Sequence, residues 1–379
     1  MSEYQYYDFR AIDRTLTEAE MTELRSISTR AEITSTSFTN HYEWGDLKAD
    51  PLKLLEKYFD AFVYVANWGT RKFWLRFPLD SFDDKQVQAM LPGEAARVRK
   101  AGKHLMVGFE SELEGDWDDG TGWMGSLIFL RSDLMRGDLR CLYLGWLLCA
   151  QNRELTEESL EPSVPAGLVE LSAPLRSMIE FLGIDEDLIA VAALTSAPFN
   201  AGPSRKELDA WIRSLPEKEK NDLVVTAVFE PGERWRNELL RRFQQQNTLS
   251  TSPTAAAIQR RRTGDLLTAA DARADERTRQ MEANRAAEAE RRKAKEAADR
   301  AQYLDQLERR QEAIWNQISA HVRKRQPNEY DKAVQLLIDL RDLAARQGLE
   351  SEFRAALEKL RRAHATKNSF LRRLTMAGL

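Results

Sequence analysis

Cysteine, histidine and long apolar runs are all scarce in this sequence. Its 379 residues include two cysteines and four histidines, and Cys141 and Cys149 are too far apart for a CxxC redox or zinc pair. The longest apolar runs, 62–66 and 142–150, fall far short of the roughly 20 residues that a membrane-spanning helix needs. The sequence therefore predicts neither a disulfide scaffold, nor a zinc site of common spacing, nor a transmembrane protein.

Motifs of the common enzyme classes are missing too. The glycines between 115 and 125 are not followed by the Gly-Lys-Ser/Thr of a phosphate-binding loop, and MGSL at 124–127 is not the GxSxG of a hydrolase. The opening SEYQYYDFR lacks the basic start and the apolar stretch of a secretory signal. We therefore expect a cytoplasmic protein without a cofactor, assign no catalytic residue, and favour a non-enzymatic protein over an enzyme.

Charges of opposite sign are concentrated in the two parts of the chain. Residues 1–233 carry 25 basic and 40 acidic side chains, a net charge of −15, whereas residues 234–379 carry 31 and 20, a net charge of +11. A basic C-terminal part suits an acidic protein partner or nucleic acid, and an acidic N-terminal part discourages non-specific binding. The same division also serves solubility alone, which is the simpler interpretation.

The N-terminal third alternates between strand and helix patterns. A capping box of Thr17 and Glu20 begins one helix, and Asp50 followed by Pro51 begins another that is expected to run to Gly69. We expect a small mixed sheet covered by these two helices. Period-two alternation and aromatic content predict its strands at 4–10, 33–44, 72–77 and 104–109.

Beyond the acidic stretch near residue 115 the pattern becomes helical. Apolar residues recur at three- and four-residue spacing, and proline, glycine and aspartate mark the loops. In the C-terminal part, helix breaks are predicted at Pro327 and Gly348. The predicted fold class is therefore α+β, mainly α. We divide the chain into an α/β N-terminal domain, a helical domain, a charged helical linker and a C-terminal helical-repeat-like bundle, at 1–120, 121–246, 247–302 and 303–379.

The predicted linker lacks the residues that build a core. Residues 244–302 contain no aromatic side chain, and Met281 is the only large apolar residue between Asp271 and Gln302. Such a segment cannot sustain a coiled-coil seam. Its many Ala, Glu, Arg and Lys residues, with acids and bases three or four positions apart, favour a solvated helix. About 45 helical residues would extend for roughly 70 Å.

The C-terminal sequence YDKAVQLLIDLRDLAARQG, followed by FRAALEKLRRAHATKNSFLRRLTMAGL, resembles the helical tail that follows the zinc site in many bacterial SWIM zinc-finger proteins. The resemblance covers about the last fifth of the chain. Those proteins are associated with nucleic-acid and partner binding through a CxC…CxH site, which is absent here, so zinc binding is not implied. The preceding parts, among them LMRGDLRCLYLGWLL, are similar to uncharacterised bacterial proteins, and the resemblance implies kinship without a specific chemistry.

Six acidic residues within 110–119 form the sharpest local feature of the sequence. If the preceding strand continues, Glu110, Glu112 and Glu114 share one face, where crowded carboxylates raise one another's pKa or recruit Mg²⁺ or Ca²⁺. The run DWDDGTG departs from the calcium-loop pattern, and a solvated acidic loop is the alternative. The candidate metal ligands are Glu112, Glu114, Asp116 and Asp118.

Basic clusters offer candidate contacts to phosphate groups or to an acidic protein surface. Few aromatic residues lie near them in the sequence, and Trp315 and Tyr330 are expected in the core rather than as base-stacking platforms. Sequence-specific reading of nucleic acid therefore has no support. The candidates are Arg260, Arg261 and Arg262 near the start of the linker, and Arg323, Lys324 and Arg325 at the end of a C-terminal helix.

These patterns predict a non-enzymatic cytoplasmic interaction or adaptor protein with a basic helical C-terminal end. The expected partner is another protein, for example the product of a neighbouring gene. Nucleic acid is the second partner class, and no membrane partner is expected. The alternative is a metal-dependent enzyme or a nucleic-acid-associated accessory factor that uses the acidic cluster 110–119.

Overall fold

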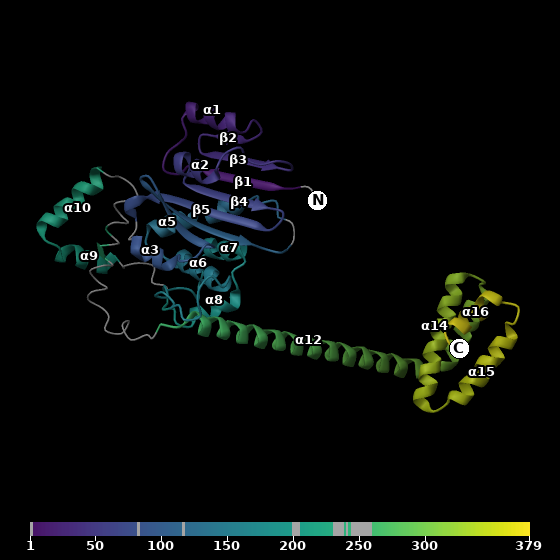
Figure 1. The fold of residues 1–379 in the computed structure, drawn as a ribbon. Helices are drawn as coiled ribbons and strands as arrows, with labels where there is room; N and C mark the ends of the chain where they lie inside the picture. The colour runs from purple at the N-terminus through teal and green to yellow at the C-terminus, as the bar shows by residue number, and fades with distance from the viewer. Residues whose placement is uncertain are drawn as a thin grey trace. The chain divides into compact units, whose positions relative to one another are not determined.

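The computed structural model describes residues 3–81, 84–115, 118–198, 205–229, 239, 242–243 and 260–379 (Figure 1). The chain forms two compact units, Met1–Arg277 and Thr278–Leu379, and each has a hydrophobic core of its own. The first unit contains the sheet, and the described residues of the second are helical apart from short connections. The predicted fold class, α+β and mainly α, is confirmed. None of the described helices is both long and apolar enough to cross a membrane.

Seven strands form one sheet in the first unit, in the order β2-β3-β1-β4-β5-β7-β6 (Figure 1). The sequence predicted a mixed sheet, but every pairing among the described strands is antiparallel. Short hairpin turns join β2 to β3, β4 to β5 and β6 to β7, and parallel pairing would need long crossovers instead. The strands are β1 Gln5–Arg10, β2 Glu32–Thr34, β3 Ser37–Tyr42, β4 Ala61–Ala66, β5 Thr70–Pro78, β6 Ala96–Ala101 and β7 His104–Glu112.

The prediction of one helix from Pro51 to Gly69 is wrong in its second half, which forms strand β4. The helix α2 covers only Pro51–Tyr58, and the apolar run Ala61–Ala66 is a central strand. A short run that is apolar throughout suits a strand buried on both faces as well as a helix, so periodicity alone does not decide between them. The two elements are separated at Asp60, whose buried carboxylate pairs with Arg76 at 2.7 Å.

Helices α1, Glu18–Ile27, and α2 cover part of one face of the sheet. Both helix starts are confirmed as predicted, because Thr17 and Glu20 form a capping box and the Asp50 carboxylate accepts a 2.8 Å hydrogen bond from the backbone N–H of Leu52. The core beneath these helices is largely aromatic, and its rings are buried. It includes Phe9, Phe38, Phe59, Phe62 and Trp74.

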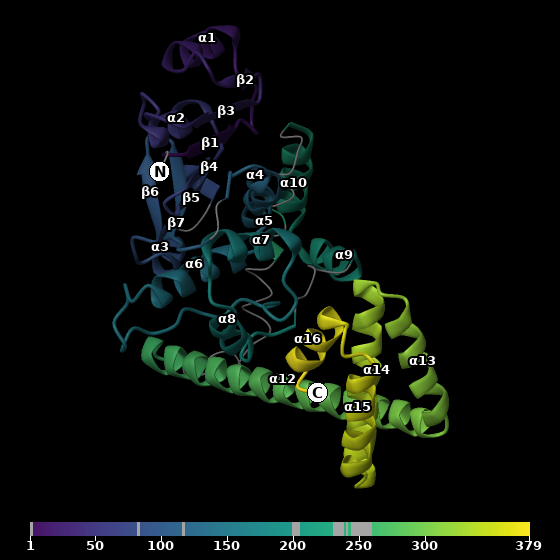
Figure 2. The same ribbon diagram turned by 90° about the vertical axis from the view of Figure 1, so that its right-hand side faces the viewer.

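The opposite face of the sheet packs against a layer of helices (Figure 2). The strands contribute a row of apolar side chains to it, among them Val63, Phe73 and Phe109. The start of a later helix, with Leu266 and Leu267, belongs to the same core. The helices of this layer are α3 Asp84–Met90, α4 Trp123–Leu127, α5 Phe129–Met135, α6 Arg140–Gln151, α7 Ala173–Leu182 and α8 Glu186–Ala193.

A smaller cluster of the first unit lies outside this core. It involves helices α9, Arg205–Ser214, and α10, Glu217–Phe229. Trp211 of α9 packs with Phe243 at a ring-centroid distance of 5.5 Å. No residue of α10 is buried, so this helix contributes little to the stability of the unit.

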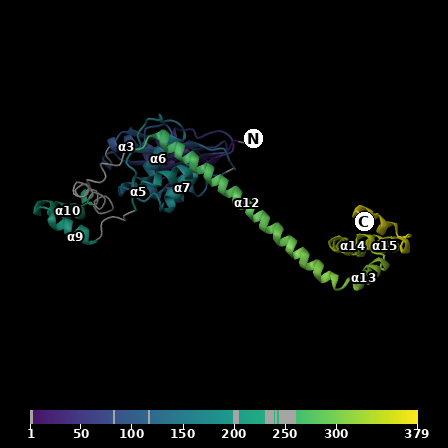
Figure 3. The ribbon, with the colours of Figure 1, turned by 90° about the horizontal axis from the view of Figure 1, so that it is seen from below.

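The predicted linker helix is confirmed over its described part. Helix α12 is uninterrupted from Thr263 to Glu308 (Figure 3). Near its start Arg277 pairs with the buried carboxylate of Asp187 at 2.7 Å, which fixes α12 to α8 within the first unit. Residues 247–259 of the predicted linker lie outside the described residues.

The second unit packs the end of α12 against shorter helices around a core of leucine, isoleucine, valine and phenylalanine. The predicted breaks are confirmed: Pro327 is the first residue of α14, and Gly348 ends that helix with a φ of 70°. Leu337 and Phe370 lie at the centre of this core and are fully buried. The helices are α13 Gln311–Arg323, α14 Pro327–Gln347, α15 Glu350–Ala363 and α16 Asn368–Met376.

Candidate functional site

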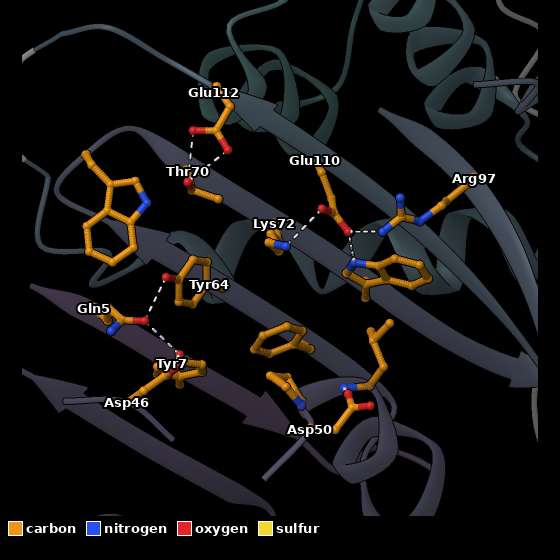
Figure 4. A pocket seen from close by; sticks show the side chains of 15 residues that line it. Gln5, Tyr7, Asp46, Asp50, Tyr64, Thr70, Lys72, Arg97, Glu110 and Glu112 are labelled. Carbon is orange, nitrogen blue, oxygen red and sulfur yellow. Dashed lines mark hydrogen bonds and ion pairs between the residues drawn. The ribbon is translucent and has the colours of Figure 1, made fainter. Parts of the chain in front are cut away.

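One part of the sheet face beneath α2 holds a cavity of about 540 Å³, here called the sheet pocket (Figure 4). Its floor is made of strand residues, and its side is made of the loop and first turn that lead into α2. This volume is typical of pockets that accept small ligands or single side chains of a partner. The lining residues are Gln5, Tyr7, Asp46, Asp50, Pro51, Leu52, Phe62, Tyr64, Trp68, Thr70, Lys72, Trp74, Arg97, Glu110 and Glu112.

Strand register brings the polar lining residues together. Tyr7 of β1 is opposite Tyr64 of β4, Tyr64 is opposite Lys72 of β5, and Lys72 is opposite Glu110 of β7. Residues that are directly opposite in antiparallel strands point to the same face. The four side chains therefore form one row across four strands, although they come from positions far apart in the sequence.

Glu110 is the best-bound carboxylate of the pocket (Figure 4). Lys72 Nζ lies 3.0 Å from its Oε2, and Arg97 Nη2 lies 2.7 Å from its Oε1. The indole N–H of Trp74 donates to the same Oε1 at 3.2 Å. Both cations of the pocket are thus engaged by one carboxylate of the protein itself.

The indole of Trp74 lies flat over the neighbouring strand because that strand has a glycine there. Gly108 is opposite Trp74, and a Cβ at position 108 would lie 2.2 Å from Trp74 Cε2. The guanidinium of Arg97 also lies over the indole, 5.3 Å from a ring centroid. The glycine therefore sets the depth of this end of the pocket.

Gln5 organises the two tyrosines at the other end. Its side-chain oxygen accepts a hydrogen bond from Tyr64 at 2.8 Å, and its amide donates to the carbonyl of Gly45 at 2.9 Å. The Tyr7 hydroxyl oxygen lies 2.9 Å from the same Gln5 oxygen and 2.6 Å from Asp46 Oδ1, and these two acceptors share its one proton. Burial first, and then the nearby Asp46 carboxylate, raise the pKa of both tyrosines far above the usual value. The hydroxyls are therefore neutral donors at physiological pH and do not serve as bases.

The rim of the pocket carries an exposed tryptophan. Trp68 lies in the tight turn between β4 and β5 and is 52 % exposed. Gly69 follows with a φ of 103°, and a Cβ there would lie 2.2 Å from the carbonyl oxygen of Leu113. A larger side chain at position 69 would therefore disturb the turn that carries Trp68.

The lining combines aromatic faces with hydrogen-bonding and charged groups. It contains no cysteine, histidine or serine, and its ionisable side chains are four carboxylates, Lys72, Arg97 and two tyrosines. Pockets with an apolar lining and a few placed polar groups are the usual form of a ligand-binding site.

The predicted acidic cluster does not converge on one point in the described residues. Glu112 lines the sheet pocket and accepts a hydrogen bond from Thr70 Oγ1, whereas Glu114 lies beyond the end of β7 and is exposed. Asp118 instead pairs with Arg71 at 2.9 Å, and Arg71 contacts the helices of the opposite layer. Asp116 lies outside the described residues. Within the described part of the chain, no group of three or more acidic, cysteine or histidine side chains is placed to hold a metal ion.

The first basic cluster is divided by the structure. Arg261 is tied into the first unit, because its guanidinium binds the buried carboxylate of Glu161 at 2.7 and 2.8 Å and donates to the carbonyl of Val191. Arg260 is exposed, and Arg262 forms a β-bridge with Leu160 through its backbone. Arg261 is therefore placed to stabilise the fold.

The second basic cluster gains two members that the sequence analysis did not include. Lys367 donates from Nζ to the carbonyl of Val322 at 2.7 Å, at the C-terminal end of α13. Burial, and then Arg325 and Arg323, lower the pKa of Lys367. Burial, then Lys367 and Arg323, lower the pKa of His364. We call Arg323, Arg325, His364 and Lys367 the basic corner of the second unit.

Lys324 points to a different group from its neighbours. Its Nζ pairs with Glu329 at 2.7 Å, and the same carboxylate binds His321 and Lys332. Lys324 is thus neutralised within the unit and does not add to the basic corner.

The fold and the pocket define a two-unit α+β protein, mainly helical, with a pocket on an antiparallel sheet. Comparison with protein families, with curated proteins and with solved structures gives no match.

Proposed function

We propose that this chain is a non-enzymatic cytoplasmic interaction protein, an adaptor, whose first unit binds a protein partner at the sheet pocket. The observation that carries this proposal is the pocket itself, where Trp68 is half exposed beside a row of buried and partly buried polar groups. Tryptophan and tyrosine around a concave site are enriched at protein interfaces. The lining supplies aromatic and polar contacts and contains no cysteine, histidine or serine.

The basic corner supports a second contact surface, in the second unit. Arg323 and Arg325 are exposed, and an acidic protein surface would complement them. Tyr330 is buried, and Trp315 packs against Phe353 in the core, so neither offers a face to a nucleic-acid base. This arrangement supports a protein partner more than nucleic acid.

The metal-dependent alternative has weaker support. Glu110 is already satisfied by Lys72, Arg97 and Trp74, and Asp118 by Arg71. A divalent cation would have to displace these bonds before it could bind at either carboxylate, and in the described part of the chain Glu112 belongs to no group of three acidic, cysteine or histidine side chains that could hold a metal ion. An adaptor role needs no such rearrangement.

A pull-down with the full chain from a lysate of the native host tests the proposal. The bait is compared with Trp68→Ala and with the matched control Trp44→Ala, which removes a tryptophan that is 71 % exposed and does not line the pocket. We expect a stoichiometric partner with the wild type and with Trp44→Ala at both low and physiological salt, and a much reduced amount with Trp68→Ala.

Two outcomes would contradict this expectation. If no stoichiometric partner is recovered at either salt concentration, the adaptor proposal fails. If Trp68→Ala retains the partner as well as the wild type does, the sheet pocket is not the binding site.

A further inference from the structure

The ionised groups of the sheet pocket are not balanced. Four carboxylates and two cations line it, which gives a net charge of −2. Lys72 and Arg97 both bind Glu110, and Arg97 also binds Glu94 at 2.6 Å. The positive charges therefore already have partners, and an incoming anion would have to compete with a carboxylate for each of them.

The remaining carboxylates, Asp46, Asp50 and Glu112, have only neutral donors. Asp46 accepts hydrogen bonds from the Tyr7 hydroxyl at 2.6 Å and from its own loop, Asp50 from the first turn of α2, and Glu112 from Thr70. In the described part of the chain, none of the three forms an ion pair. Figure 4 shows Asp46 beside Tyr7 and Gln5 at one edge of the pocket and Glu112 beside Thr70 at another, both away from Arg97.

Aromatic faces accompany these free carboxylates. Tyr64, Phe62 and the half-exposed Trp68 line the same cavity. The negative face of an aromatic ring attracts a cation, most strongly when the ring is tryptophan and water is partly excluded. Carboxylates without a cation and aromatic rings around one cavity both select for positive charge on an organic group.

We propose that the sheet pocket receives the ammonium or guanidinium group of a lysine or arginine side chain carried by an exposed peptide segment of the partner. This inference rests on the proposed adaptor function and names the chemistry that the pocket recognises. The aliphatic stem of such a side chain packs on the apolar lining at Leu52 and Phe62, while its charge meets one of the free carboxylates, Asp46 or Glu112. A bare metal ion would use neither the aromatic faces nor the apolar lining.

Titration calorimetry of the full chain with small probes tests this inference. The cationic probes are acetyl-Gly-Lys-Gly-amide and acetyl-Gly-Arg-Gly-amide. The matched probes replace the central residue by norleucine, which keeps the stem without the charge, or by glutamate. Butylammonium is the free-amine probe. We expect the two cationic peptides to bind at least about tenfold more tightly than the norleucine, glutamate and butylammonium probes.

Substitution of Asp46 and Glu112, two of the three free carboxylates, supplies the matched protein variants; Asp50 is left in place because it caps α2. Asp46→Asn with Glu112→Gln keeps the acceptor oxygens for Tyr7 and Thr70 but removes the charge, and we expect about tenfold weaker binding of the cationic peptides. Glu114→Gln removes an exposed charge outside the pocket and should bind like the wild type. Equal unfolding midpoints of the three proteins show that the fold is kept.

Equal affinity of the lysine and norleucine peptides, or unchanged binding by the double variant, would overturn the inference. Butylammonium that binds as tightly as the lysine peptide would overturn the peptide source and identify a site for free amines. If the pull-down loses the partner with Trp68→Ala but keeps it with the double variant, the pocket does not recognise a cation. The proposed adaptor function is then still supported.

Discussion

Single residues decide how the pocket face of the sheet is shaped. Trp74 is almost fully buried, yet its indole N–H reaches Glu110 because Gly108 leaves the space above the neighbouring strand empty. Arg97 then covers the indole and reaches the same carboxylate. One absent side chain thus allows a ring, a cation and a carboxylate to occupy three neighbouring strands.

Gly108→Ala should therefore destabilise the first unit. The new methyl group would lie within 2.4 Å of three ring atoms of Trp74, and neither the strand nor the buried indole can move freely. We expect a loss of about 1–3 kcal/mol in the free energy of unfolding, measured by denaturant titration. The control is Gly115→Ala, where a Cβ meets nothing within 4 Å. Equal stability of the two variants would show that Trp74 does not depend on the glycine.

At the scale of strands and helices, the sequence predicted what depends on local pattern. The strand at Lys72 to Phe77, the capping box at Thr17 and the breaks at Pro327 and Gly348 all rest on neighbouring residues, and the structure confirms them. The alternation of that strand indicated one buried face, but Trp74 and Arg76 on its second face are buried too. The apolar run 61–66 was misassigned because a strand buried on both faces has no alternation to show.

The pocket could not be predicted in the same way. Its central row takes one residue from each of β1, β4, β5 and β7, and only the strand order brings them together. The one signal for the pocket was the presence of Thr70 and Lys72 on a strand that is otherwise buried. Polar side chains are unusual on a strand that is covered on both faces, so they indicate that the cover is incomplete there. Without the pairing, that signal does not identify Tyr7 or Glu110 as neighbours.

The start of α12 is held by an ion pair of Arg261, a residue that the sequence suggested as a contact for a partner. Arg261 binds Glu161, which is 3 % exposed and also accepts a hydrogen bond from the Tyr143 hydroxyl. Removal of the guanidinium would leave a buried carboxylate without its cation.

We therefore expect Arg261→Ala to lower the free energy of unfolding of the first unit by about 3 kcal/mol. Arg260→Ala, at an exposed position next to it, should change stability by no more than about 0.5 kcal/mol. Thermal and denaturant unfolding of the two variants check this expectation. Similar small effects for both would return Arg261 to the candidates for partner binding.

At the scale of the whole molecule, each unit has its own core and its own candidate surface. The sheet pocket lies in the acidic first part of the chain, and the basic corner lies in a unit whose residues 303–379 carry 15 basic and 10 acidic side chains. Net charge of each sign steers different partners. The two surfaces therefore need not compete for one ligand.

Because the second unit has a core of its own, we expect residues 278–379 to fold without the rest of the chain. Its centre is complete within α13–α16 and the end of α12, with Ile318, Leu337 and Phe370 fully buried. We expect a helical circular dichroism spectrum and one cooperative unfolding transition for this fragment. Leu337→Ala in the same fragment should cost about 2–5 kcal/mol. A gradual transition, unaffected by that substitution, would contradict an independent core.

The start of α12 in the core of the first unit has a consequence for folding during synthesis. All residues that line the sheet pocket lie within positions 5–112, so this side of the sheet is complete once β7 has left the ribosome. The opposite side waits much longer, because Leu266, Leu267 and Ala270 belong to its core. While the intervening residues are translated, the nascent chain presents an apolar surface that later residues will bury, and over this interval it depends most on chaperones.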